Sequence, residues 1–127
     1  MKAYSTNIHD EAKMNDAFRR VVFTGAKMQL VVMSLKPHEE IGVEAHPDTD
    51  QFFHIEKGTA KFEFDDSIIT IDDGSVVVVP AGTRHNVINP SSYEDLKFYT
   101  IYAPPQHPGG TLQKSKAEAE VLHPVTV

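Results

Sequence analysis

The stretch that decides the fold is GSVVVVPAGTRHNVIN, residues 74–89. Its valines predict a strand, because β-branched residues favour extended backbone. Pro80 and Gly82 then predict a sharp turn, after which a second strand starts at His85. Because the four valines are consecutive, they also indicate a strand buried on both faces, so we expect another element to pack outside it.

Most of the remaining chain also reads as short strands separated by turn residues. The strand candidates are rich in Val, Ile and aromatic residues, and they are residues 20–24, 28–35, 43–46, 52–56, 60–64, 68–71, 76–80, 85–88 and 97–102. This pattern predicts an all-β fold, a double-stranded β-helix (jelly roll) that hides its sheet edges and carries short flanking helices. We expect a single domain over residues 1–127, with a barrel core at about 20–103.

The two ends of the chain read differently from the middle. Asp10 is the candidate N-cap of a short helix that runs through Phe18. Ser115 and Glu118 have the spacing of a capping box, which predicts a second helix that ends before Pro124. The segment 104–127 begins with a proline- and glycine-rich connector, and we expect it to pack over the barrel or its mouth.

Composition excludes several classes of function. The chain has no cysteine, which excludes disulfides, iron–sulfur clusters and a cysteine nucleophile and fits a cytoplasmic protein. The net charge of −6 argues against nucleic acid as a partner, and no secretion signal or membrane span is evident. The sequence also lacks a nucleophile elbow, a phosphate-binding loop and a dinucleotide-binding glycine motif.

Polar residues gather on one face of two neighbouring strand candidates. Side chains alternate across a strand, so Glu44 and His46 share a face. A turn over residues 47–50 leads to the next strand, where Gln51 begins a face that continues with two apolar residues. The residues of the opposite face, Phe52 and His54, need another cover. We therefore expect a homodimer with a mostly apolar interface.

The spacing within residues 74–89 resembles the second signature motif of the cupin family: Gly, five residues, Pro, one residue, Gly, two residues, His, three residues, Asn. The first cupin motif reads Gly, five residues, His-x-His, three or four residues, Glu, six residues, Gly. Counting back from Gly58 puts Gln51 in the place of the glutamate and His46 in that of the second histidine. The chain departs from this motif at three positions, His38, Glu44 and Gln51.

The resemblance implies a small jelly-roll barrel that binds one divalent transition metal ion (Zn, Mn, Fe or Ni) near its mouth. The implied ligands are Glu44, His46, Gln51 and His85, a mixed set that is distantly similar to that of the cupin phosphomannose isomerases. Gln51 is alternatively a hydrogen-bond donor to substrate or water. If the register slips by one residue, Asp48 or Asp50 becomes a ligand instead.

The function that this implies is a metal-dependent enzyme that acts on a small, oxygen-rich organic molecule, by an isomerase, lyase or dioxygenase type of reaction. Three residues near the expected mouth are candidates for supplying a proton: Tyr99, Tyr102 and His107. The alternative is a non-catalytic cupin that binds a sugar or another small molecule. A fold shared by so many activities does not select among them.

Overall fold

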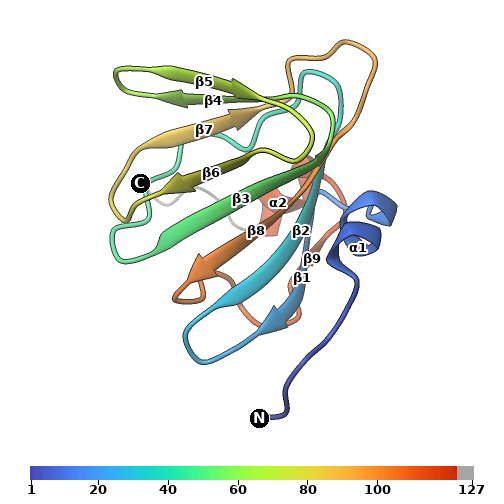
Figure 1. The fold of residues 1–127 in the computed structure, drawn as a ribbon, viewed down its shortest axis with the longest axis vertical. Helices are drawn as coiled ribbons and strands as arrows, with labels where there is room; N and C mark the ends of the chain where they lie inside the picture. The colour runs from blue at the N-terminus through green and yellow to red at the C-terminus, as the bar shows by residue number, and fades with distance from the viewer. Residues whose placement is uncertain (123–127) are drawn as a thin grey trace.

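Two antiparallel sheets pack around a common core in the computed structural model, which describes residues 1–122 (Figure 1). One sheet has six strands in the order β6-β3-β8-β2-β1-β9, and the other has three in the order β5-β4-β7. The strands are β1 (Arg19–Thr24), β2 (Gln29–Leu35), β3 (Asp50–Lys57), β4 (Ala60–Phe64), β5 (Ile68–Ile71), β6 (Val76–Val79), β7 (His85–Ile88), β8 (Leu96–Ala103) and β9 (Leu112–Gln113). The helices are α1 (Ile8–Met14) and α2 (Lys116–Leu122). The predicted all-β, double-stranded β-helix fold is confirmed.

The predicted strand over residues 43–46 is wrong. This segment is a loop that joins the sheet at a single bridge, between Glu44 and His85. Gly42 precedes it with a φ of 106°, and Pro47 follows it without an N–H to donate, so the segment cannot extend into a regular strand. The strand β9 is a further difference, because its two residues are too few to give a pattern in the sequence.

The core lies between the two sheets and is filled by alternate side chains of the strands. On β3, Gln51, Phe53 and Ile55 are buried whereas Phe52 and His54 are only half-buried, as the alternation predicts. The ring of Phe53 is fully buried, with the Phe62 ring 5.0 Å and the Phe98 ring 5.8 Å from it, between centroids. Aromatic residues from both sheets therefore meet at the centre of the barrel.

The valine strand β6 is buried on one face only, which corrects the prediction of burial on both. Val77 and Val79 are buried, whereas Val76 and Val78 are 49% and 61% exposed. The physical reason is that β6 is the edge strand of its sheet, and among residues 1–122 no element covers its outer side.

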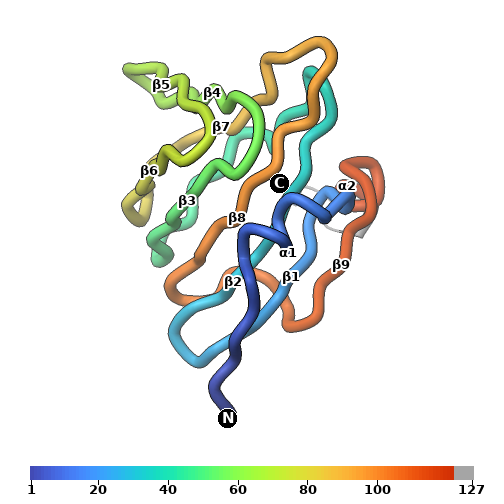
Figure 2. Tube along the Cα trace, turned by 45° about the vertical axis from the view of Figure 1, so that its right-hand side comes forward, coloured from blue at the N-terminus to red at the C-terminus, as the bar shows by residue number. Residues whose placement is uncertain are grey.

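Helix α1 packs on the outer face of the six-stranded sheet, where it crosses β8 and β2 (Figure 2). Its N-cap is Asn7, not the predicted Asp10, since the Asn7 side chain accepts the N–H of Asp10 at 3.0 Å. The helix also ends at Met14, four residues before Phe18, because the Asn15 side chain bonds with the backbone of Ala17 and turns the chain.

After β8 the chain returns to the six-stranded sheet. There β9 pairs with the start of β1, and α2 follows. The N–H of Glu118 donates to the Ser115 hydroxyl at 3.0 Å, which agrees with the predicted cap of this helix. Pro124 and the rest of residues 123–127 lie outside the described residues. Neither α1 nor α2 has the length and apolar character of a membrane span, nor has any other helix within residues 1–122.

We predict that Gly58→Ala destabilises the protein by about 2 kcal/mol or more, and by at least about 1 kcal/mol more than Gly74→Ala. Both glycines have positive φ, 97° and 83°, so both substitutions strain the backbone. Only at Gly58 would the new Cβ also lie 2.9 Å from a backbone oxygen, that of Asp95, whereas nothing lies within 4 Å at Gly74. Urea denaturation of the two variants measures the difference. Equal losses would show that the clash is relieved without cost.

Candidate functional site

The loop over residues 42–46 brings its polar side chains to the start of β7. Glu44 and His85 exchange both backbone hydrogen bonds, each 2.9 Å long, so these two residues stand directly opposite each other. The carbonyl of His46 accepts the N–H of Gly82 at 2.8 Å, which ties the loop to the Pro80–Gly82 turn. The predicted turn and the start of β7 therefore hold the loop that carries Glu44 and His46 next to His85.

Glu44, His46 and His85, three of the predicted metal ligands, lie close to one another, and the fourth, Gln51, lies near them beside Tyr102. The rings of His46 and His85 lie 5.8 Å apart between centroids, and the Glu44 carboxylate is 3.4 Å from Nε2 of His46. Gln51 stands across from Tyr102 in the β3–β8 pairing, and the His46 ring is 5.8 Å from that of Tyr102. His46, Gln51 and His85 are buried, whereas the Glu44 side chain is 29% exposed.

Two of these ligands present buried polar atoms that have no hydrogen-bond partner. One is Nε2 of His46, which is within ion-pair distance of Glu44 but not aligned for a hydrogen bond. The other is Oε1 of Gln51, whose amide nitrogen donates to the Thr100 hydroxyl at 2.9 Å. Buried polar atoms normally have a hydrogen-bond partner. We therefore expect each of these two atoms to bind a group that the protein's own side chains do not supply.

A hydrogen bond of His85 determines which of its two ring nitrogens carries the proton. Its Nδ1 lies 2.9 Å from the carbonyl oxygen of Thr83, and because a carbonyl only accepts, Nδ1 carries the proton. The lone pair of a neutral ring is then on Nε2, and a carbonyl contact of this kind commonly orients a metal-binding imidazole.

Burial lowers the pKa of His46 below its usual value of 6.5, an effect that nearby His85 and Arg19 reinforce and the Glu44 carboxylate opposes. His46 is therefore held in the neutral form that can donate a lone pair.

The imidazoles of His46 and His85, the carboxylate of Glu44 and the amide of Gln51 are donors of the kinds that bind metal ions. As the side chains stand, however, no group of three or more His, Asp or Glu within residues 1–122 is arranged to hold a metal ion.

We predict that metal-free protein loses stability as the pH falls below about 6.5, and that His46→Gln reduces this loss. The folded-state pKa of His46 is lowered, so in that range the unfolded state binds more protons than the folded state, and the free energy of unfolding decreases as the pH drops. Denaturation of chelator-treated wild type and variant between about pH 5 and 8 measures how steeply the free energy of unfolding changes with pH in each protein. The lower limit of about pH 5 lies below the usual pKa range of histidine. Identical slopes would contradict the burial of a neutral His46.

The three predicted proton donors do not lie together. Tyr102 is buried beside His46, and its hydroxyl lies 3.3 Å from Nε2 of His107. Burial raises the pKa of Tyr102 to about 12, against the opposing effect of Arg19. Tyr99 instead points to the outer face of β8, where its ring stacks on that of His54 at 5.1 Å. The structure thus brings Tyr102 and His107 to the site and leaves Tyr99 outside it.

The connector after β8 folds over this end of the barrel. The fully buried amide of Gln29 accepts the N–H groups of Gln106 and His107 at 3.2 and 3.0 Å, and it donates to the carbonyl of His107 at 2.7 Å. A pocket of about 460 Å³ opens beside the connector. Its lining includes Glu44 and His107, which link it to the buried cluster. These contacts tie Gln106 and His107 to β2, and the packing of the whole segment 104–127 over the barrel or its mouth stays a prediction.

One charged residue beside the predicted ligands, Arg19, was not predicted from the sequence. In the β1–β2 pairing it stands opposite Met33, a core residue, and so it points inward, whereas Arg20 stands opposite Val32 and points outward. Arg19 is 6% exposed, lines the same pocket, and donates to Oε1 of the buried Gln113 at 2.7 Å. The pairing of β9 with β1, which the sequence did not predict, supplies that partner.

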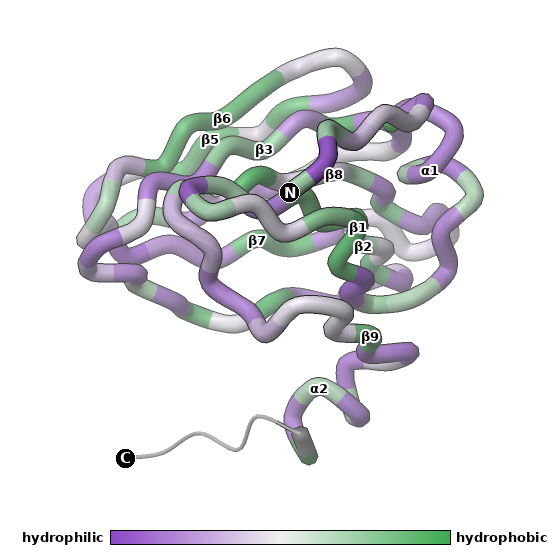
Figure 3. The backbone as a smooth tube through the Cα atoms, turned by 90° about the horizontal axis from the view of Figure 1, so that it is seen from below, coloured by the Kyte–Doolittle hydropathy of each residue, from purple (hydrophilic) through white to green (hydrophobic). Residues whose placement is uncertain are grey.

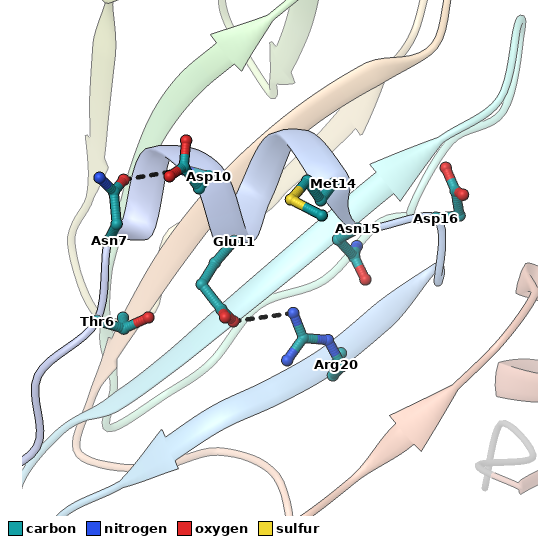
Figure 4. A pocket seen from close by; sticks show the side chains of 8 residues that line it. All are labelled: Thr6, Asn7, Asp10, Glu11, Met14, Asn15, Asp16 and Arg20. Carbon is teal, nitrogen blue, oxygen red and sulfur yellow. Dashed lines mark hydrogen bonds and ion pairs between the residues drawn. The ribbon is translucent and has the colours of Figure 1, made fainter.

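A second hollow, of about 380 Å³, lies under α1 on the outer face and contains none of the predicted site residues (Figure 4). Its two long charged side chains, Glu11 and Arg20, pair with each other at 3.0 Å. Because these charges already satisfy each other, the hollow offers less to a ligand than the pocket at the barrel mouth.

Comparison with known proteins identifies the family. Residues 31–102 match the family model of the cupin domain. The chain is 44% identical over 124 residues to the protein YrkC of Bacillus subtilis (strain 168), covering 93% of this chain and 66% of that protein. It is 42% identical over 121 residues to protein L612 of Acanthamoeba polyphaga mimivirus, covering 93% and 76%. The crystal structure of BH2720 from Bacillus halodurans superposes with a TM-score of 0.90 at 41% identity, over 94% of this chain and 95% of that one. With its fold, its motif over residues 74–89 and these relatives, the chain belongs to the cupin family.

Proposed function

We propose that this cupin is a metal-dependent enzyme that acts on a small, oxygen-rich organic molecule in the pocket at the barrel mouth. The metal ion would be held by Glu44, His46, Gln51 and His85. The observation that carries this proposal is the pair of buried ligand atoms without partners, Nε2 of His46 and Oε1 of Gln51, beside a second oriented imidazole. A bound cation would satisfy both atoms at once.

Two imidazoles, one carboxylate and one amide oxygen suit Zn, Mn, Fe or Ni, and this donor set does not choose among them. A metal ion held there supplies a Lewis acid for a carbonyl or enolate oxygen. Apolar side chains in the barrel would also limit the size of the ligand, since the buried ring of Phe53 lies 6.1 Å from that of His85, between centroids.

Two residues of the chain support proton transfer at this site. With a pKa of about 12, the Tyr102 hydroxyl stays protonated near neutral pH, so it donates a hydrogen bond or a proton to a ligand oxygen. His107 lies next to that hydroxyl and lines the pocket, and it connects Tyr102 to the side from which a substrate enters. Tyr99, on the outer face, has no part in the proposal.

The experiment is turnover by protein that is first treated with a chelator and then reloaded separately with each of the four metals. The substrates are a panel of sugars, sugar phosphates, keto acids and enols. We expect activity that depends on the metal, and a loss of about a hundredfold or more in Tyr102→Phe, as is typical when a general acid is removed. The matched control is Tyr99→Phe, the same change on the same strand but on the opposite face.

The alternative is a non-catalytic cupin that binds a sugar or another small molecule in the same pocket. The arrangement of the side chains favours it in one respect, because no three His, Asp or Glu within residues 1–122 are set to ligate a metal. Binding of a panel member without turnover by any of the four metal forms would support this alternative and contradict the enzyme.

We also propose that the chain forms a homodimer through the outer side of β6 and the neighbouring β3. Figure 3 shows hydrophobic residues along β5 and β6 at the rim of the fold, where Val76 and Val78 are exposed. A second copy is the simplest cover for an apolar edge strand. Sedimentation at micromolar concentration is expected to give a dimer mass, and Val78→Lys is expected to give a monomer. A monomeric wild type would contradict the proposal.

A further inference from the structure

Arg19 carries a positive charge that its surroundings do not neutralise. It is 6% exposed, and within residues 1–122 no carboxylate lies within ion-pair distance of its guanidinium. Its contacts are with neutral groups: Oε1 of Gln113 at 2.7 Å, the face of the Phe18 ring at 5.2 Å, and the Tyr102 hydroxyl, whose pKa Arg19 lowers. Its Nε is buried and has no hydrogen-bond partner. Burial of a charge without a counter-ion costs free energy, so binding of an anion to Arg19 would be favourable.

The neighbouring arginine shows the contrast. Arg20 points to the outer face and pairs with the carboxylate of Glu11 at 3.0 Å, as an arginine on a protein surface commonly does (Figure 4). Packing therefore does not prevent arginine–carboxylate pairing in β1. It is the inward position of Arg19 that lacks a carboxylate partner among the described residues.

The pocket at the barrel mouth gives an anion access to Arg19. Its lining includes Arg19, Glu44, His107 and Lys116. The Lys116 ammonium already faces the carboxylate of Glu120 at 3.9 Å. Arg19 is thus the cation of this pocket for which residues 1–122 offer no carboxylate, and it lines the same pocket as the proposed metal ligand Glu44.

We infer that Arg19 binds a carboxylate group of the substrate, so that the substrate class is small carboxylic acids that carry a second oxygen function. The inference rests on the proposed function, since the second oxygen would face the metal ligands. A pocket of about 460 Å³ accommodates such a molecule. A single guanidinium matches the single charge of a carboxylate, and the nearby Glu44 carboxylate disfavours a doubly charged phosphate.

The test is isothermal titration of the purified protein with pyruvate and lactate, with their uncharged amides, and with inorganic phosphate. We expect the carboxylates to bind about ten- to a hundredfold more tightly than the amides, as one hydrogen-bonded charge contact predicts. Arg19→Gln should remove this preference, Arg19→Lys should keep part of it, and the matched control Arg20→Gln should leave it unchanged. Tighter binding of phosphate than of either carboxylate would overturn the carboxylate class.

A measurement on the wild type keeps the inference testable if the Arg19 variants do not fold. The Nε–H resonance of Arg19, identified by elimination with Arg20→Gln and Arg84→Gln, should shift during titration with pyruvate but not with pyruvamide. A resonance that pyruvate leaves in place overturns the inference.

Metal content, measured on the same samples, separates this inference from the proposed function. A carboxylate preference that depends on Arg19 in protein that binds no metal would support the carboxylate site and contradict the metal-dependent enzyme. Metal-loaded protein without a carboxylate preference would leave the enzyme standing and overturn the role of Arg19.

Discussion

Replacing both His46 and His85 with alanine is expected to reduce the metal content of the purified protein from about one ion per chain to less than a tenth of that. Removal of a residue that merely orients a ligand already lowers metal affinity about 10- to 100-fold, so loss of two imidazole ligands should lower it by more. The remaining donors would be one carboxylate that is 29% exposed and one amide oxygen, which together bind transition metals weakly.

The matched control is His38→Asn, because His38 is an exposed histidine with a φ of 64°, a backbone conformation that asparagine tolerates. Elemental analysis of wild type, double variant and control, all purified without chelator, measures the effect. Equal metal content in the double variant and the wild type would contradict the ligand assignment. Loss of metal in His38→Asn would show that the metal ion is bound near His38 instead.

The largest effect on stability is expected for Phe53→Ala, a loss of about 3–5 kcal/mol in the free energy of unfolding. Phe53 is fully buried, and its ring packs with those of Phe62 and Phe98 between the two sheets. The change removes buried apolar surface and leaves a cavity that the closed barrel cannot collapse to fill. A domain of this size is stable by only about 5–15 kcal/mol, so the loss is a large share of the total.

Urea denaturation of chelator-treated protein measures this loss without a contribution from bound metal. Tyr93→Ala is the control, since Tyr93 is an aromatic residue that is 85% exposed, and its change should stay within about 0.5 kcal/mol. A loss below about 1 kcal/mol for Phe53→Ala would mean that the centre of the barrel is not the packed core described above.

The sequence predicted best where turn residues and alternation agree. Pro80 and Gly82 bound β6 and β7, and the structure has these strands at Val76–Val79 and His85–Ile88, within one residue of the prediction. The inward face of β3, which begins with Gln51, is likewise as predicted. Both features depend on contacts between residues near each other in sequence, for which local pattern is a sufficient guide.

The sequence was a poorer guide to features that depend on contacts between segments far apart in the chain. Arg19 points inward because β1 pairs with β2 and β9 in one particular register, and nothing within β1 itself specifies that register. The exposure of Val76 and Val78 follows from the place of β6 at the sheet edge, which depends on the order of all strands. Tyr99 differs, because the alternation along β8, which puts it on the opposite face from Tyr102, would have excluded it as a proton donor from the sequence alone, and its prediction was wrong for that reason.

The measurement that tests the central claim most directly is the relaxation of water protons in the presence of the protein loaded with Mn²⁺. We expect wild type to bind the ion with at least one exchangeable water, so that the relaxation rate rises well above that of the free ion. The variant that lacks His46 and His85 should give the rate of free Mn²⁺. A site that binds Mn²⁺ without exchangeable water, or a double variant that relaxes water as the wild type does, would contradict it.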